Sequence, residues 1–189
     1  MATWLDIVGS FIIGGIIILI LVNLNLFINS SSQENLYTNI VQESLSTTAE
    51  VVEHDFYRIG AGVSGSQIAL ADSNAIMFYG DESDSGKIDT VYYYLGSTAQ
   101  LSATPNPNDR IMYRVLNNAT PLPTTTVNDF KLTYYDSAGV ELNYSTLTNP
   151  VQRDKIRSLK IYLKVESPQP VDSVYQAAEW RRRIFPKNL

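Results

Sequence analysis

The sequence predicts an α+β protein in which a long N-terminal helix, membrane-spanning in its first half and amphipathic in its second, packs on an antiparallel β-sheet. Three observations support this fold class. Residues Ile7–Ile28 form an uncharged apolar run. From Ser30 to Ile59 apolar residues recur every three or four positions with no proline. Beyond Gly60, short apolar and aromatic runs alternate with links rich in Pro, Asn and Gly.

The apolar run is long enough to cross a bilayer as one helix. About 20 residues at a rise of 1.5 Å span a hydrocarbon core of roughly 30 Å. A buried core helix is disfavoured because the following segment is polar and rich in Ser and Asn. A cleaved signal peptide is disfavoured because the run has neither a basic segment before it nor a small-residue cleavage box after it. We therefore expect residues 1–29 to be a retained transmembrane helix.

Five residues of this segment are candidate contacts to other helices. Gly14 and Gly15 remove side chains where another helix can approach closely, although Gly is also common in such helices. Asn23 and Asn25 either hydrogen-bond to other helices or mark the membrane interface. Asp6 lies where the positive end of the helix dipole stabilises a carboxylate. Neither flank carries a nearby Lys or Arg, so charge bias indicates no orientation.

Residues 30–60 read as a second helical segment with one apolar face. Ser31 or Ser32 could cap a new helix, or the first helix could run straight through. Gly60 is expected to end the segment. The apolar stripe comprises Leu36, Ile40, Val41, Leu45, Ala49, Val52, Phe56 and Ile59. This face needs a cover, which we expect from the β-rich remainder, residues 61–189.

The remainder is expected to form an antiparallel sheet. An acidic turn, GDESDSGK, joins the first two predicted strands as a hairpin. The last strands alternate apolar and polar residues, as expected for a sheet with one buried face. The predicted strands are Ala75–Tyr79, Ile88–Leu95, Ile111–Leu116, Val127–Tyr135, Ile156–Glu166 and Val174–Phe185.

The residues for an enzyme active site are not assembled in this sequence. There is no cysteine, and the only histidine, His54, lies among acidic residues in the helical segment, where a structural role is expected. Residues 60–65 spell G-x-G-x-x-G, but they follow a helix and precede strands, which is the reverse of a dinucleotide site. We therefore predict no enzymatic activity, no cofactor and no metal site.

Acidic residues cluster in the predicted hairpin turn. Their side chains could offer oxygen atoms to Ca²⁺, but the spacing differs from that of an EF-hand loop. A solvated turn is the simpler interpretation, and calcium binding stays open. The cluster consists of Asp81, Glu82, Asp84 and Asp89.

Charge is distributed unevenly along the chain, whose net charge is −5. The first sixty residues carry six acidic side chains against the single base Arg58, and the tail from Arg153 onward is basic. Such halves can complement each other within one molecule or between neighbours. The basic residues are too few, and lie mostly in strand patterns, for nucleic acid to be a partner.

Several segments resemble type IV pilins and type II secretion pseudopilins, most closely the minor J-type pseudopilin and related minor pilins. The similar segments are the helix end EHDFYRIG, the strand AIMFYGD, then TVYYYL, DRIMYR, VNDF with TYYDSAG, and the late strand IRSLKIYLKVESP. The resemblance implies a subunit that inserts into lipid, packs helix to helix with other pilin-like subunits in a short filament, and presents its sheet outward. It also implies a single-pass protein of the bacterial inner (cytoplasmic) membrane with its C-terminal domain outside the cytoplasm.

The resemblance suggests a role for Asp6. Members of the family carry a glutamate at the fifth mature position and a short basic leader, and this chain has neither. If Met1 is removed, Asp6 becomes the fifth residue, and its carboxylate could satisfy the terminal amine of a neighbour. The alternative function is a membrane-tethered extracytoplasmic domain that binds a ligand, a carbohydrate or Ca²⁺ without joining a filament.

Overall fold

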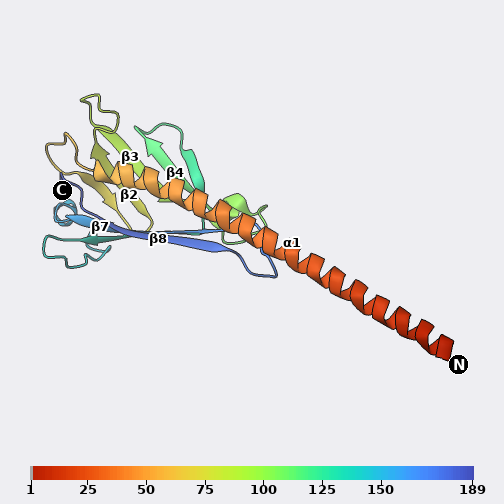
Figure 1. Ribbon diagram of the computed structural model, residues 1–189. Coiled ribbons are helices and arrows are strands. Elements are labelled where there is room, and N and C mark those ends of the chain that lie inside the picture. Colours follow the sequence, from red (N-terminus) through yellow and green to blue (C-terminus); the bar gives the residue numbers. More distant parts are fainter. Residues whose placement is uncertain (1) are drawn as a thin grey trace.

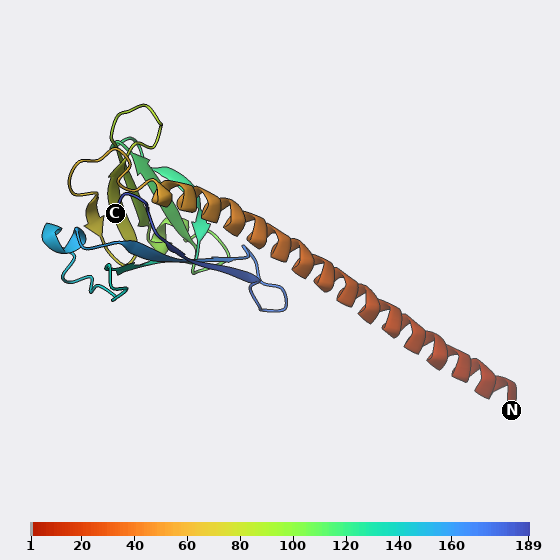
Figure 2. The same ribbon diagram turned by 60° about the vertical axis from the view of Figure 1, so that its left-hand side comes forward.

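The computed structural model describes residues 2–189 and shows one long helix joined to two antiparallel sheets (Figure 1). Helix α1 (Ala2–Tyr57) has 56 residues and no break at Ser31 or Ser32, so the first helix runs straight into the second segment. At 1.5 Å per residue it is about 84 Å long. Its N-terminal half projects away from the sheets, as Figure 2 shows from a second side.

The amphipathic half of α1 supplies one wall of the core. Its buried apolar side chains are Val41, Leu45, Ala49, Val52 and Phe56, followed by Ile59 just after the helix. The predicted stripe was wrong at its beginning, because Leu36 and Ile40 are 56% and 42% exposed. Ile40 is next to Val41, which is 2% exposed, so its exposure reflects the side of the helix on which it lies. The buried stripe therefore begins at Val41.

Eight strands follow α1 and divide between two sheets. The first sheet has the order β1-β2-β3-β4-β5 and contains β1 (Ile68–Ala71), β2 (Ala75–Gly80), β3 (Asp89–Leu95), β4 (Arg110–Leu116) and β5 (Leu122–Val127). The second has the order β6-β7-β8 and contains β6 (Asp129–Tyr135), β7 (Ser158–Glu166) and β8 (Ala177–Ile184). A short 3-10 helix η1 (Thr98–Leu101) and a short helix α2 (Pro150–Arg153) lie in the connections.

The antiparallel pairing and the α+β class are confirmed, and so is the β2–β3 hairpin around the acidic turn. The segment Val127–Tyr135, predicted as one strand, breaks at Asn128. The Asn128 side-chain oxygen accepts a hydrogen bond from the Glu166 backbone N–H at 2.6 Å. The backbone N–H of Asn128 donates to the Lys164 carbonyl at 2.9 Å. These bonds hold the corner at which the chain leaves one sheet and enters the other.

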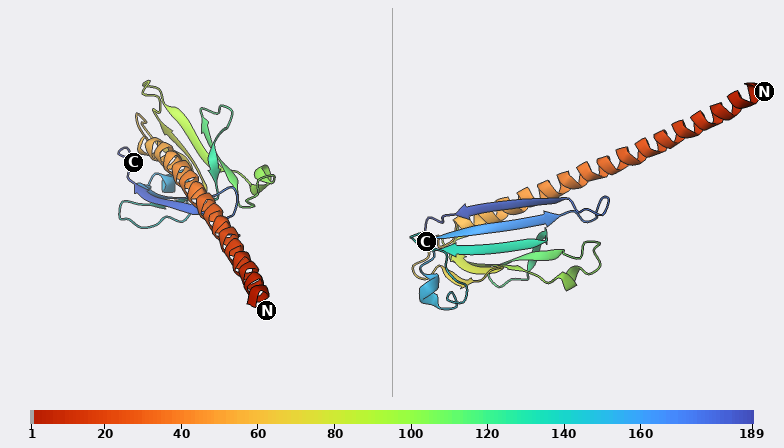
Figure 3. Two further views of the ribbon diagram at one scale, coloured as in Figure 1. Left: turned by 45° about the vertical axis from the view of Figure 1, so that its right-hand side comes forward. Right: turned by 90° about the horizontal axis from the view of Figure 1, so that it is seen from below.

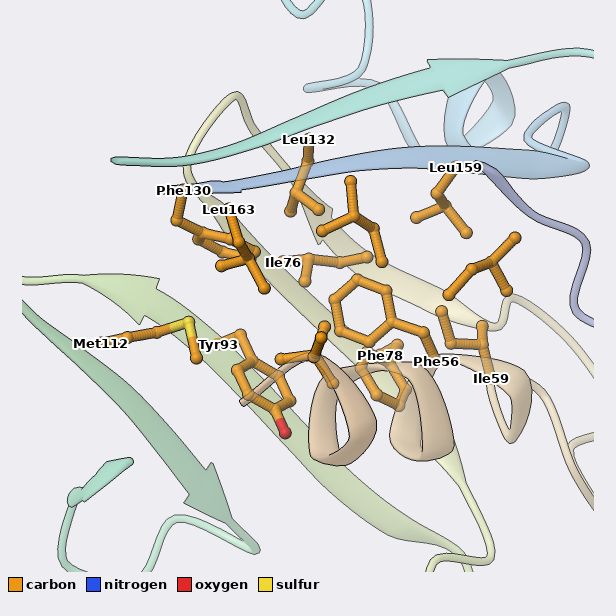
Figure 4. Packing of buried hydrophobic residues seen from close by; sticks show 14 of the residues in the cluster. Phe56, Ile59, Ile76, Phe78, Tyr93, Met112, Phe130, Leu132, Leu159 and Leu163 are labelled. Carbon is orange, nitrogen blue, oxygen red and sulfur yellow. The ribbon is translucent and has the colours of Figure 1, made fainter. Parts of the chain in front are cut away.

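Helix α1 lies between the two sheets (Figure 3). On one side the Ser44 hydroxyl contacts the Thr125 hydroxyl of β5 at 3.2 Å, and on the other Glu53 pairs with Arg182 of β8 at 2.7 Å. Figure 4 shows Phe56 pointing into the space between the sheets. Its ring meets those of Phe78 and Tyr93 edge to face, with centroids 5.6 and 5.5 Å apart.

The glycine-rich segment after α1 forms a tight exit from the helix. Gly60 has φ +79°, a conformation that side-chain-bearing residues rarely adopt, and its N–H donates to the Tyr79 carbonyl at 2.8 Å. A Cβ here would approach Gln67 and the Asn188 carbonyl within 3.0 Å or less. As expected, residues 60–65 join a helix to a strand. Gly60 lies against Asn188, next to the C-terminal residue.

Candidate functional site

The exposed half of α1 is the first candidate site. Its most apolar 18-residue window has a mean hydropathy of 2.7, and none of that window is buried. Large apolar side chains such as Trp4, Phe11, Leu19 and Phe27 are 63–77% exposed. Within residues 2–189, α1 is the one helix long and apolar enough to cross a membrane. This surface is compatible with a single-pass membrane anchor.

The five predicted contact residues all lie on this uncovered half, but they do not share a face. Residues two apart are separated by 200° on a helix, so Asn23 and Asn25 point to nearly opposite sides. At Gly14 and Gly15 no atom lies within 4 Å of where a Cβ would be, so the backbone is open to an approaching partner. Asp6 lies beyond the first turn of the described helix, which contains no acidic residue, so the expected stabilisation of its carboxylate by the helix dipole is weaker there.

Asn25 has a partner on its own helix. Its side-chain oxygen accepts a hydrogen bond from the Asn29 amide at 2.8 Å. Ser10 makes a similar local contact, because its hydroxyl donates to the Asp6 carbonyl at 2.8 Å. Hydrogen bonds within the helix give such polar side chains a partner where lipid offers none.

A buried polar cluster holds the end of α1 to the five-stranded sheet. Asp55 falls on the buried face of the helix, one turn after Val52, and its side chain is 3% exposed. Its Oδ2 accepts hydrogen bonds from the Tyr93 hydroxyl of β3 and from Nε of Arg114 in β4, both at 2.5 Å. A carboxylate bound to a guanidinium and a phenol at this depth is a strong, directional attachment.

Glu82 brings a second carboxyl group into this cluster. Its Oε1 lies 3.3 Å from Nη2 of Arg114, and its side chain is 9% exposed. Burial and then the neighbouring Asp55 raise the pKa of Glu82 from 4.5 to about 8. Burial alone would raise the pKa of Asp55, but bonds from Glu82, Arg114 and Tyr93 outweigh it and hold the pKa below 3.8. At neutral pH the pair therefore carries one proton, on Glu82, and one negative charge, on Asp55.

Substituting Glu82 by glutamine should remove a pH dependence of stability. Because the folded pKa lies above the unfolded one, the native state holds a proton between pH 4.5 and 8 that the unfolded chain has lost. The stability that this proton gives is complete at low pH and is lost as pH rises through 8. The free energy of unfolding should thus fall by up to about 1.4 kcal/mol per pH unit in this window, and by less in Glu82→Gln.

The measurement is urea unfolding of the full chain in detergent at pH 5, 6, 7 and 8. Trp180 packs on the core and can report unfolding by fluorescence in a Trp4→Phe background. Asp84→Asn is the matched control, since Asp84 pairs with Arg58 at the surface and is 82% exposed. A Glu82→Gln profile parallel to that of the parent would contradict the assignment of the proton.

His54 extends the cluster to the surface. Its side chain is 62% exposed, as expected, and Nδ1 lies 3.5 Å from both Asp55 Oδ1 and Glu82 Oε1. A His and two carboxylates at this spacing resemble a set of metal ligands. Arg114 already provides the positive charge between the two carboxyl groups, and this favours a structural junction over a metal centre.

The acidic turn between β2 and β3 uses its carboxylates to fix its own backbone. Asp81 accepts the N–H groups of Ser85 and Gly86 at 2.9 and 2.8 Å. Asp89 accepts the Asn117 amide at 2.7 Å, which lowers the pKa of Asp89 below its ordinary value. These bonds explain the acidic residues as turn-forming groups.

Sequence reasoning found the helix surface but missed the buried cluster. Asp55 is 38 residues from Tyr93 and 59 residues from Arg114 along the chain. One signal was available, since Asp55 lies three residues after Val52 and one before Phe56, within the apolar stripe. An acidic residue in such a stripe requires a buried partner.

Comparisons of the chain with known protein families, with characterised proteins and with solved structures give no significant match.

Proposed function

We propose that the chain is a membrane-anchored structural subunit, similar to minor pilins and pseudopilins, that assembles through α1 into a pilus or a secretion pseudopilus. Its place would be the bacterial cytoplasmic membrane, with the sheets outside the cytoplasm. The observation that carries the proposal is the division of one unbroken helix into an uncovered apolar half and a half embedded in the core. A rigid rod of this form can bury its apolar half in lipid and against the helices of other subunits.

Tethering alone needs only a hydrophobic span, whereas assembly also needs surfaces that fit other helices. Lipid tails are as apolar as Leu, so helices in a membrane associate through small residues and polar side chains. The open backbone at Gly14 and Gly15 and the amides of Asn23 and Asn25 supply such groups on several sides of α1. Contacts on several sides suit a helix that is surrounded by others in a filament.

The proposal predicts that the identity of the span matters beyond its hydrophobicity. Two full-length variants replace Ile7–Ile28 with a Leu-rich span, one without Gly or Asn and a control that keeps Gly14, Gly15, Asn23 and Asn25. The first should lose membrane complexes, measured by chemical cross-linking, by about tenfold, which corresponds to the roughly 1–2 kcal/mol of such contacts. The control should retain them.

Equal amounts of complexes in the two variants and in the parent would contradict the proposal. The helix would then act only as a tether, and the alternative of a membrane-bound binding domain would be favoured. Fluorescence of Trp180 should be the same in all three proteins, because the replaced residues lie outside the core.

A further inference from the structure

The side of α1 that faces away from both sheets carries an acidic stripe, defined here as Glu43 and Glu50. The two residues are seven positions apart, so they lie two turns apart on one face. Both are exposed, and in the part of the chain that the structure describes neither pairs with a Lys or Arg side chain. Ile40 and Val51 beside them are 42% and 37% exposed. The stripe therefore combines unpaired negative charge with uncovered apolar surface.

The outer face of the three-stranded sheet carries a basic patch, defined here as Lys160 and Arg183. Lys160 of β7 and Arg183 of β8 are register partners, so their side chains lie together on one face of the sheet. Both residues are exposed, and among residues 2–189 neither forms an ion pair with a carboxylate. By contrast, Arg181 on the same face is neutralised by Glu179 at 2.6 Å.

The patch is held in shape before any partner arrives. The Arg183 guanidinium lies 4.0 Å from the centre of the Tyr135 ring and 5.2 Å from that of Phe185. Its Nε and Nη2 also donate to the Ser158 hydroxyl at 3.0 and 2.9 Å. A side chain fixed in this way loses little conformational entropy on binding.

The position of the patch along the helix follows from a neighbouring contact. Arg182, next to Arg183, pairs with Glu53 at 2.7 Å, so the patch is level with Glu53. Glu50 and Glu43 lie three and ten residues nearer the N-terminus, which is about 5 and 15 Å along the axis. One molecule therefore carries the two complementary surfaces at different heights and on different elements.

We propose that the basic patch of one copy binds the acidic stripe of a second copy, displaced outward along the helix axis by about 5–15 Å. The inference rests on the proposed function, because anchoring in one membrane holds all copies parallel. A contact between two different surfaces of the same chain repeats from copy to copy and builds a line of subunits. Charge complementarity selects a second copy, since the chain supplies both halves.

The chain has no cysteine, so introduced cysteines can test the contact directly. Two differently tagged full-length copies, Glu50→Cys and Lys160→Cys, are expressed together in membranes and oxidised. A disulfide that joins the two tags forms only between copies. We expect it at about fivefold the level of a control in which Thr120→Cys, on the exposed β4–β5 turn, replaces Lys160→Cys.

Charge reversal tests whether attraction causes the cross-link. Glu43→Lys in the first copy or Arg183→Glu in the second should each reduce it by about three- to fivefold, and the two together should restore it. Raising the salt concentration should also reduce it, because salt screens exposed charges. A cross-link no stronger than the Thr120 control, or no restoration by the double reversal, would overturn the inference.

A Leu19→Cys pair, placed in the apolar half of α1, separates this result from the proposed function. If the Leu19 disulfide forms and the Glu50–Lys160 disulfide does not, copies associate through their spans and the inference is wrong. If neither forms, copies do not associate, and self-assembly fails together with the inference.

Discussion

Replacing Arg114 by methionine is expected to lower the free energy of unfolding at pH 7 by about 3–5 kcal/mol. Asp55 and Glu82 are 3% and 9% exposed, and Arg114 contacts both. Without this guanidinium, Asp55 keeps a buried negative charge beside a second carboxyl group. Methionine has similar length and no polar group, so the cost comes from the lost charge and hydrogen bonds.

The pH dependence gives this prediction a signature that lost packing would not produce. Arg114 is among the groups that hold the Asp55 pKa below 3.8. In Arg114→Met the burial of Asp55 would raise its folded pKa above the unfolded value, so the stability gained by protonation returns as pH falls. The parent also gains stability as pH falls, through Glu82, so the signature is the difference between the two proteins. The deficit of the variant relative to the parent should shrink between pH 7 and 5, measured by urea unfolding with Trp180 fluorescence.

Arg181→Met is the matched control. Arg181 is also a strand residue paired with an acid, Glu179, but the two side chains are 60% and 42% exposed. Exposed pairs contribute about 0–1 kcal/mol, so this variant should unfold almost like the parent. Similar losses in the two variants, or no recovery of Arg114→Met relative to the parent at pH 5, would show that the buried cluster does not fix the helix.

Replacing Phe56 by alanine is the second change with a large expected effect, about 3–5 kcal/mol. Phe56 is fully buried and packs edge to face on Phe78 and Tyr93. These contacts join α1 to β2 and β3, so their loss leaves a cavity where the helix enters the core. Loss of the edge-to-face geometry adds to the cost of the buried area.

Tyr57→Ala serves as the control because the neighbouring ring is 40% exposed. We expect its unfolding midpoint in urea to stay close to that of the parent. Equal midpoints for Phe56→Ala and the parent would mean that the second half of α1 is not part of the cooperative core.

The elements with a clear hydrophobic periodicity were predictable from the sequence, and the edge strands of the five-stranded sheet were not. The buried stripe from Val41 to Phe56 follows the helical period, and the β2–β3 hairpin follows alternation around a polar turn. The two missed strands, β1 and β5, form the two edges of the five-stranded sheet. β1 has only four residues and β5 contains Pro123, which an edge strand tolerates because one side of it needs no hydrogen-bond donors.

The candidate site divides in the same way. The apolar surface of α1 depends on local composition, so the sequence was enough to locate it. The buried cluster depends on β3 and β4 bringing Tyr93 and Arg114 opposite Asp55, and on the β2–β3 turn presenting Glu82. Local patterns do not specify which strands become neighbours, and so the partners of Asp55 were not predictable.

Helix α1 has no break at Ser31 and Ser32. The two sheets, here called the head, therefore point in a fixed direction about the axis of the apolar half of the helix, here called the anchor. Each residue added to or deleted from α1 between the anchor and the buried stripe would rotate the head by about 100° and shift it by about 1.5 Å along the axis. Length changes of about seven, eleven or eighteen residues would return it to about the same direction. The number of residues between the anchor and the head thus sets both the direction in which the sheets point and their distance from the anchor.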